Sequence, residues 1–170
     1  SMAISVRDAR ERKGDRAFIE HSLRDYLVDL GGMNSGVFPV LQEFGHRDPD
    51  QVAGWLADRN ALLLTVVDEQ QPTGFALVLR DPPGAVGVDF RMAEFFIARN
   101  ARGRGAGRSA VRLIFDRFAG RWEVVQNQRN SGAVAFWRRV ISLYTRGDYR
   151  ERTNNGEVRQ TFRSGTAAPR

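Results

Sequence analysis

Polar and apolar residues follow two different periods along this chain, and the two periods predict a series of strands and helices. Apolar runs and period-two alternation are typical of strands, whereas apolar residues three and four positions apart are typical of helices. Asp15 and Asp48 are expected to cap the first two helices. The expected strands are 3–7, 61–67, 75–80, 86–98, 121–127, a short one near 142–146 and 157–163. The expected helices are 15–30, 48–56, 109–118 and one that begins after Asn130.

A glycine-rich turn between the strand at 86–98 and the helix at 109–118 is the most informative segment. It contains Gly103, Gly105 and Gly107 and leads directly into a helix with one apolar stripe. Glycine lets a ligand approach the backbone closely, and the unpaired N–H groups and dipole of a helix start favour a negative charge. The sequence therefore predicts a binding site for a phosphorylated ligand at this turn.

The spacing of the turn separates it from two common phosphate-binding loops. No Gly-Lys-Ser/Thr follows, as a P-loop requires, and the glycines do not match G-x-G-x-x-G. What remains, Arg102-x-x-Gly105-x-Gly107, resembles the R/Q-x-x-G-x-G/A motif with which the GNAT N-acetyltransferase superfamily cradles the pyrophosphate of acetyl-CoA. A second segment, Asn130-x-x-Ala133-x-x-Phe136-Trp137, resembles the N-x-x-A-x-x-F-Y pattern of the next helix in that family.

The resemblance covers about residues 60–150 and implies both a fold and an activity. The implied fold class is α/β, mixed α+β: a twisted, mixed sheet of six to seven strands with helices on both faces. We expect one such domain over residues 1–163 and a flexible tail over 164–170. The implied activity is acetyl-CoA-dependent N-acetylation, in which an amine of a small molecule or peptide attacks the thioester directly within a ternary complex.

The resemblance also implies which residues hold acetyl-CoA. In the family, backbone groups at the end of the fourth strand hold the pantetheine arm, the turn holds the pyrophosphate, and the helix-start asparagine contacts the arm. The cofactor-binding residues expected on this basis are Phe95, Phe96, Ile97, Arg102, Gly103, Arg104, Gly105, Ala106, Gly107, Arg108, Asn130 and Trp137.

Two glutamates are candidates for the base that deprotonates the amine. Strict alternation places Glu94 on the same strand face as Phe90, Met92 and Phe96, where desolvation would raise the pKa of a carboxyl toward a useful range. A salt bridge, or a bulge that turns the side chain outward, is the structural alternative. Glu123 on the next strand is the second candidate, and its alternative is a solvated strand residue.

The acid that protonates the leaving thiolate is where the chain departs from the family pattern. Trp137 stands where the usual tyrosine is expected, and we expect its indole to pack against the pantetheine arm or the adjacent strand. The acid would then be Tyr144, expected one short loop beyond the helix, or solvent. The N-terminal helices usually shape the acceptor pocket, so Tyr26, Asp29 and Trp55 are possible acceptor contacts.

Composition limits the alternatives. The chain has 26 basic and 20 acidic residues, but the arginines are spread among Asp and Glu, so no nucleic-acid partner is expected. The absence of cysteine excludes disulfides and thiolate metal sites, and we expect no metal. No long apolar run or leader is visible, so we expect no membrane contact, a cytoplasmic location and a monomer or homodimer. A non-catalytic acyl-CoA-binding domain and, further off, an arginine-rich nucleic-acid-binding module remain as alternatives.

Overall fold

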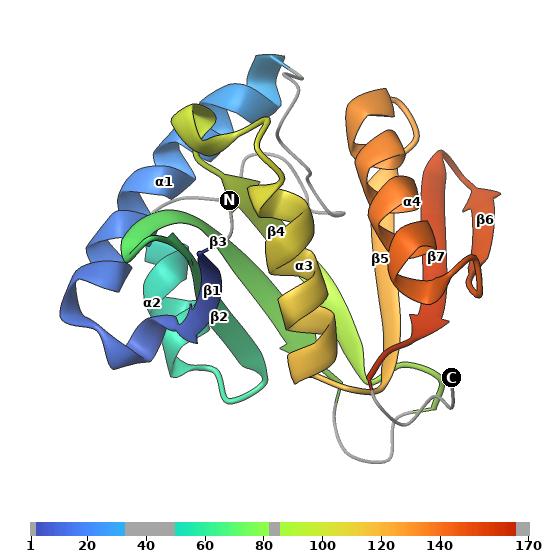
Figure 1. The fold of residues 1–170 in the computed structure, drawn as a ribbon, viewed down its shortest axis with the longest axis horizontal. Helices are drawn as coiled ribbons and strands as arrows, with labels where there is room; N and C mark the ends of the chain where they lie inside the picture. Colours follow the sequence, from blue (N-terminus) through green and yellow to red (C-terminus); the bar gives the residue numbers. More distant parts are fainter. Residues whose placement is uncertain (1–2, 33–49, 82–85, 166–170) are drawn as a thin grey trace.

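The computed structural model of the protein describes residues 3–32, 50–81 and 86–165, in which seven strands form one sheet with helices on both faces (Figure 1). The strands are β1 (Ile4–Asp8), β2 (Ala61–Asp68), β3 (Gln71–Arg80), β4 (Phe90–Ile97), β5 (Arg121–Asn127), β6 (Arg150–Asn154) and β7 (Glu157–Arg163). The helices are α1 (Lys13–Gly32), α2 (Asp50–Ala57), α3 (Ala106–Arg117) and α4 (Ser131–Thr145), with 3-10 turns η1 (Ala9–Glu11) and η2 (Arg99–Ala101).

The sheet has the strand order β1-β2-β3-β4-β5-β7-β6, and neighbouring strands are antiparallel except for β4 and β5. These two strands run parallel, as a connection through a crossover helix such as α3 permits. They pair only at Phe90 with Trp122 and at Arg91 with Glu123. Beyond these two positions the described strands are not paired, so the sheet is open between the end of β4 and the end of β5.

Two hydrophobic layers hold the helices against the sheet. Phe95, Phe115 and Trp122 belong to the layer beneath α3 and α4, and both helices lie on one side of the sheet (Figure 1). Tyr26 and Phe75 belong to the layer beneath α1 and α2. Among the helices in the described residues, none has both the length and the apolar character needed to cross a membrane.

The element order predicted from the sequence is confirmed, and the expected mixed sheet is present with seven strands. Several local predictions are wrong. Asp15 does not cap α1 but lies inside its first turn, where its carboxylate accepts two hydrogen bonds of 2.8 Å from Arg7. The expected cap Asp48 lies outside the described residues. The β2–β3 turn needs only Glu69 and Gln70, both with positive φ, so β3 begins at Gln71.

The C-terminal third departs further from prediction. Residues 142–146 do not form a strand, because α4 continues through Thr145 and ends at Arg146 in the left-handed conformation. The strand that replaces it, β6, is exposed along its whole length. Ser164, the expected first residue of the tail, is buried; its amide donates to the Gly120 carbonyl over 2.7 Å and its hydroxyl donates to the Phe118 carbonyl. Residues 166–170 lie outside the described structure.

A β-bulge in β4 decides which way its side chains point. Leu77 pairs with Glu94 while its neighbour Val78 pairs with Met92, so Ala93 is an extra residue in the ladder. Met92 therefore packs beneath α3 and α4, whereas Phe96 packs beneath α1. The expectation that Glu94 shares a face with Phe90 and Met92 is wrong, because the bulge interrupts the alternation.

Candidate active site

The glycine-rich turn forms the start of α3 as an open backbone surface. Gly105 is the N-cap residue, in the left-handed conformation with a φ of 81°, and it offers no side chain to cap the helix. A Cβ added to Gly103 or Gly105 would meet nothing within 4 Å. The Gly105 carbonyl accepts from the Ser109 amide at 3.0 Å, so the helix is regular from its first turn. Without a capping side chain, the first-turn amides can donate to an external anion.

A cavity of about 660 Å³ lies at this helix start, between the end of β4 and one face of α4. Its volume falls within the range of small-molecule sites. The backbone of Gly107 lies close to the Phe136 ring on α4, because a Cβ added to Gly107 would lie 3.4 Å from that ring. The lining residues are Ile97, Arg102, Gly103, Gly105, Ala106, Gly107, Arg108, Phe136, Arg139 and Val140.

Arginines give the cavity a positive charge. Arg102 is held in place, because its Nε donates to the Ile97 carbonyl over 2.8 Å and its guanidinium lies 5.5 Å from the centre of the Phe96 ring. Arg108 and Arg139 are exposed and form no ion pair or hydrogen bond through their side chains within the described part of the chain. Guanidinium groups that are already ion-paired are less available to a ligand, so these two are the available phosphate ligands here.

The second motif builds the wall opposite the turn. The Asn130 side-chain oxygen accepts from the Ala133 amide over 3.0 Å and so caps α4. Phe136 stacks on Phe95 with ring centres 6.0 Å apart, and Trp137 meets Phe95 edge-on at 5.5 Å. The indole thus packs against β4, one of the two positions expected for it.

Trp137 is fully buried, and its Nε1 has no hydrogen-bond partner among the described residues. Because this atom has no accessible surface, a ligand cannot reach it without a change of side-chain conformation. The tryptophan therefore shapes the cavity from behind and does not line it.

Glu94 and Tyr26 form a buried polar pair on the other side of β4. The Tyr26 hydroxyl donates to the Glu94 carboxylate over 2.9 Å, and both side chains are almost completely buried. The Tyr26 ring lies 5.6 Å from Phe96 and 6.1 Å from Phe75. The bulge at Ala93 brings the two side chains together, because it turns Glu94 toward α1.

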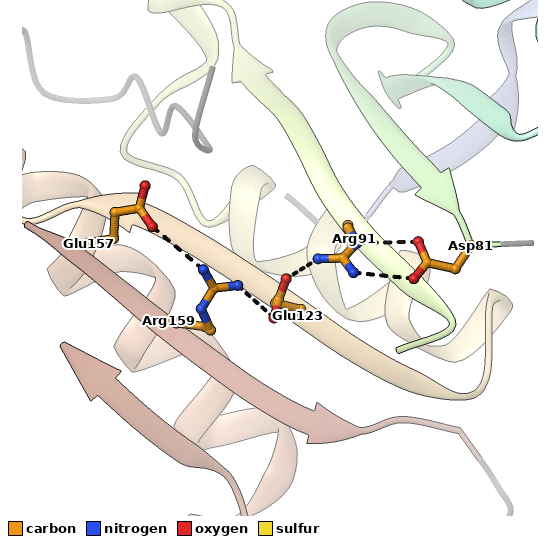
Figure 2. A network of polar contacts seen from close by, with 5 residues as sticks. All are labelled: Asp81, Arg91, Glu123, Glu157 and Arg159. Atoms are coloured by element: carbon orange, nitrogen blue, oxygen red, sulfur yellow. Dashed lines mark hydrogen bonds and ion pairs between the residues drawn. The ribbon is translucent and has the colours of Figure 1, made fainter. Parts of the chain in front are cut away.

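Glu123 lies in a chain of ion pairs on the sheet (Figure 2). Arg91 contacts one of its oxygens, and Arg159 contacts the other over 2.7 Å. Arg91 also binds Asp81, and Arg159 also binds Glu157. The Glu123 side chain is only 10% exposed, so it is a buried, doubly paired carboxylate and not a solvated strand residue.

Tyr144 is in the last turn of α4, not beyond the helix as expected. Its hydroxyl donates to the Asp116 carboxylate over 2.6 Å and accepts from the Gly165 amide. Asp116 is near the end of α3, about 15 Å from the helix start at a rise of about 1.5 Å per residue. The structure therefore does not bring the Tyr144 hydroxyl to the cavity at the glycine turn.

The predicted cofactor-binding residues do not include three that line the cavity. Phe136, Arg139 and Val140 are three and four positions apart on α4, and this helical spacing could have placed them on one face. Tyr26 was noted only as a possible acceptor contact, and its pairing with Glu94 joins residues 68 positions apart. Of the other possible acceptor contacts, the side chain of Asp29 lies outside the described residues, and Trp55 packs at the edge of the layer beneath α1 and α2.

Comparisons with solved structures show the same fold. An acetyltransferase from Thermus thermophilus is 15% identical with a TM-score of 0.62, covering 95% of this chain and 97% of its own. The ribosomal-protein-S18-alanine N-acetyltransferase of Escherichia coli is 10% identical with a TM-score of 0.61, covering 97% and 96%. N-acetylglutamate synthase from Neisseria gonorrhoeae, solved with coenzyme A and N-acetyl-glutamate, is 12% identical with a TM-score of 0.59, covering 95% and 35%.

Comparison with curated protein sequences gives no match. The sequence profile of the Acetyltransferase (GNAT) family, in contrast, matches residues 18–141, which is more than half of the chain. The matched region contains the glycine turn and the Asn130 motif, and thus both segments that form the cavity. Enzymes of this family generally take the acetyl group that they transfer from acetyl-CoA. The chain therefore belongs to the GNAT acetyltransferase family and is an N-acetyltransferase.

Proposed function

We propose that the protein acetylates a primary amine of a small molecule or peptide in a ternary complex with acetyl-CoA bound at the glycine turn. The observation that carries the proposal is the uncapped start of α3, which opens into a cavity of about 660 Å³. Two arginines of this cavity, Arg108 and Arg139, have no ion-pair partner in the described part of the chain. Such a site suits a flexible, multiply charged phosphate ester.

Different residues of the cavity would hold different parts of acetyl-CoA. The amides of Ala106, Gly107 and Arg108, in the first turn of α3, would donate to the pyrophosphate, and Arg108 and Arg139 would supply positive charge beside it. Phe136 offers an apolar wall for the arm that leads toward β4. Acetyl-CoA, when bound, supplies the acetyl group as an activated thioester. The residues that hold it thus set the position at which the amine must arrive.

Glu94 is the base in this proposal, and Tyr26 holds its carboxylate in position. Glu94 is 1% exposed, so a proton from the amine must reach it through a water molecule and not by direct contact. Glu123 is less suited to the role, because two arginines already bind its two oxygens.

No side chain among the described residues is assigned as the acid for the thiolate. Trp137 has no accessible N–H, and the Tyr144 hydroxyl lies at the other end of α3. Water therefore protonates the leaving group, which a thiolate tolerates better than a more basic leaving group would.

A screen of amines tests the proposal. Release of the coenzyme A thiol is measured with acetyl-CoA and a panel of small amines and peptides, and the acetylated product is identified by mass spectrometry. With an accepted amine, Glu94→Gln should lower turnover about a hundredfold and change the pH–rate profile, with acetyl-CoA affinity nearly unchanged.

Glu123→Gln is the matched control, because it removes a carboxylate of similar burial from the neighbouring strand. It should keep most of the turnover. If Glu123→Gln loses turnover and Glu94→Gln does not, the assignment of the base is reversed. If acetyl-CoA binds but none of the amines is acetylated, the proposed acceptor class is wrong.

A further inference from the structure

The sheet has a second cavity, at the opposite end of β5 from the glycine turn. Its volume is about 630 Å³, similar to that of the first, and the two share no lining residue. The strand β5 is about 20 Å long at roughly 3.3 Å per residue, and the second cavity lies at its first two residues, Arg121 and Trp122. The lining residues are Gly87, Arg121, Trp122, Asp148, Tyr149, Arg150, Thr161, Phe162 and Arg163.

Three arginines meet at this cavity because of the strand register. Arg121 on β5 is the direct cross-strand partner of Arg163 on β7, and Arg150 on β6 is the partner of Thr161. Like charges directly opposite one another in a sheet are destabilising. Asp148 is the one acidic residue in the lining, so the cavity carries an excess of positive charge.

The pairing state of these arginines sets them apart from their neighbours. Arg91 on β4 and Arg159 on β7 are each bound to two carboxylates (Figure 2). The side chains of Arg121, Arg150 and Arg163 form no ion pair or hydrogen bond within residues 3–32, 50–81 and 86–165, and all three are exposed. Within the described residues, acidic side chains thus neutralise Arg91 and Arg159 but not the three arginines of the cavity.

We propose that this cavity is a second anion site, which binds a small molecule carrying at least two negative charges, such as a phosphate ester or a polycarboxylate. The Arg121 and Arg163 guanidinium groups would donate to the anion from the two sides, and Arg150 and the Thr161 hydroxyl from β6 and β7. Binding would replace the repulsion between Arg121 and Arg163 with charge-assisted hydrogen bonds. This site does not depend on acetyl-CoA binding at the glycine turn.

Titration calorimetry with inorganic pyrophosphate as the probe tests the proposal. The glycine-turn cavity should bind pyrophosphate too, so the parent protein should show two binding events. The double variant Arg121→Gln/Arg163→Gln should lose one event, or weaken it about tenfold or more, and keep the other. The double variant Arg108→Gln/Arg139→Gln should show the reverse.

Equal loss of charge elsewhere provides the control. Arg24 and Arg59 are exposed and lie away from both cavities, so Arg24→Gln/Arg59→Gln should keep both events within about twofold. The proposal is overturned if the parent shows no event beyond the one that Arg108→Gln/Arg139→Gln removes. It is equally overturned if the control pair weakens binding as much as Arg121→Gln/Arg163→Gln does, since net charge alone would then explain the result.

A single variant guards against misfolding of the double one. Arg150 is on the exposed strand β6, where substitution disturbs no core packing, and Arg150→Gln should weaken the same event. Pyrophosphate should also raise the melting temperature of the parent more than that of Arg150→Gln. Equal thermal shifts in the two proteins would count against the site.

Discussion

Replacement of Gly105 by valine separates backbone strain from loss of binding. Gly105 has a φ of 81°, and a Cβ there would meet no protein atom, so the substitution costs conformational energy without a steric clash. The left-handed conformation costs a residue with a Cβ about 1–2 kcal/mol. For a chain of this length, that corresponds to a fall in melting temperature of about 2–8 °C.

The loss of acetyl-CoA binding should be far larger than the strain explains. The valine side chain would occupy the open space through which a phosphate approaches the first-turn amides of α3. Each charge-assisted hydrogen bond contributes about 1.5–3 kcal/mol, so losing two weakens binding at least about a hundredfold.

Gly156 provides a matched control for this experiment. It has a φ of 78° and the same open surroundings, but it lies in the β6–β7 turn, away from the cavity. The melting temperature of Gly156→Val should fall by about as much as that of Gly105→Val. Calorimetry should show that Gly156→Val binds acetyl-CoA like the parent. If Gly105→Val also binds like the parent, acetyl-CoA does not bind at this helix start.

Three further substitutions test other parts of the structure. Tyr144→Phe should lower the free energy of unfolding in urea by about 1 kcal/mol, through loss of the bond to Asp116, and leave the acetylation rate unchanged; a tenfold loss of rate would restore Tyr144 as the acid. Glu123→Gln should cost about 1–3 kcal/mol in the same assay, because its arginine partners are half-exposed; no loss would mean that the ion pairs contribute nothing. Burial disfavours the charge on Asp15, but hydrogen bonds and charge from Arg7 outweigh it and lower the pKa of Asp15. The resulting stabilisation is complete above the ordinary carboxyl pKa of about 3.9 and disappears as the pH falls through the folded value. Asp15→Asn should therefore lower the melting temperature at pH 7 and converge with the parent below about pH 4, whereas a constant difference would refute the role of ionisation.

The glycine turn could be predicted because its geometry is local. Three glycines and one helical stripe, all within about fifteen residues, are enough to define a strand end, a left-handed cap and a helix start. Only the part of the cavity formed by the turn could be predicted, because Arg139 comes from α4, some thirty positions away in the sequence.

The parts that could not be predicted depend on insertions and on long-range contacts. One extra residue, Ala93, reverses the direction of Glu94, and an alternating pattern in the sequence cannot show where a ladder gains a residue. The strand β6 has no buried face and therefore no apolar alternation to detect. The end of α4 was misread because residues 142–146 are as compatible with a strand as with a helix, and packing against Phe115 and Phe162 decides between them.

The opening between β4 and β5 has a mechanical consequence. The half of the sheet formed by β1 to β4 and the half formed by β5, β7 and β6 share only two positions of ladder. A ligand lying along the end of β4 would therefore take the place of a strand that the chain does not supply. A ligand in the opening would contact both halves, so the two halves would move less relative to each other with the ligand bound than without it. The rigidity of the fold would then depend on its cosubstrate.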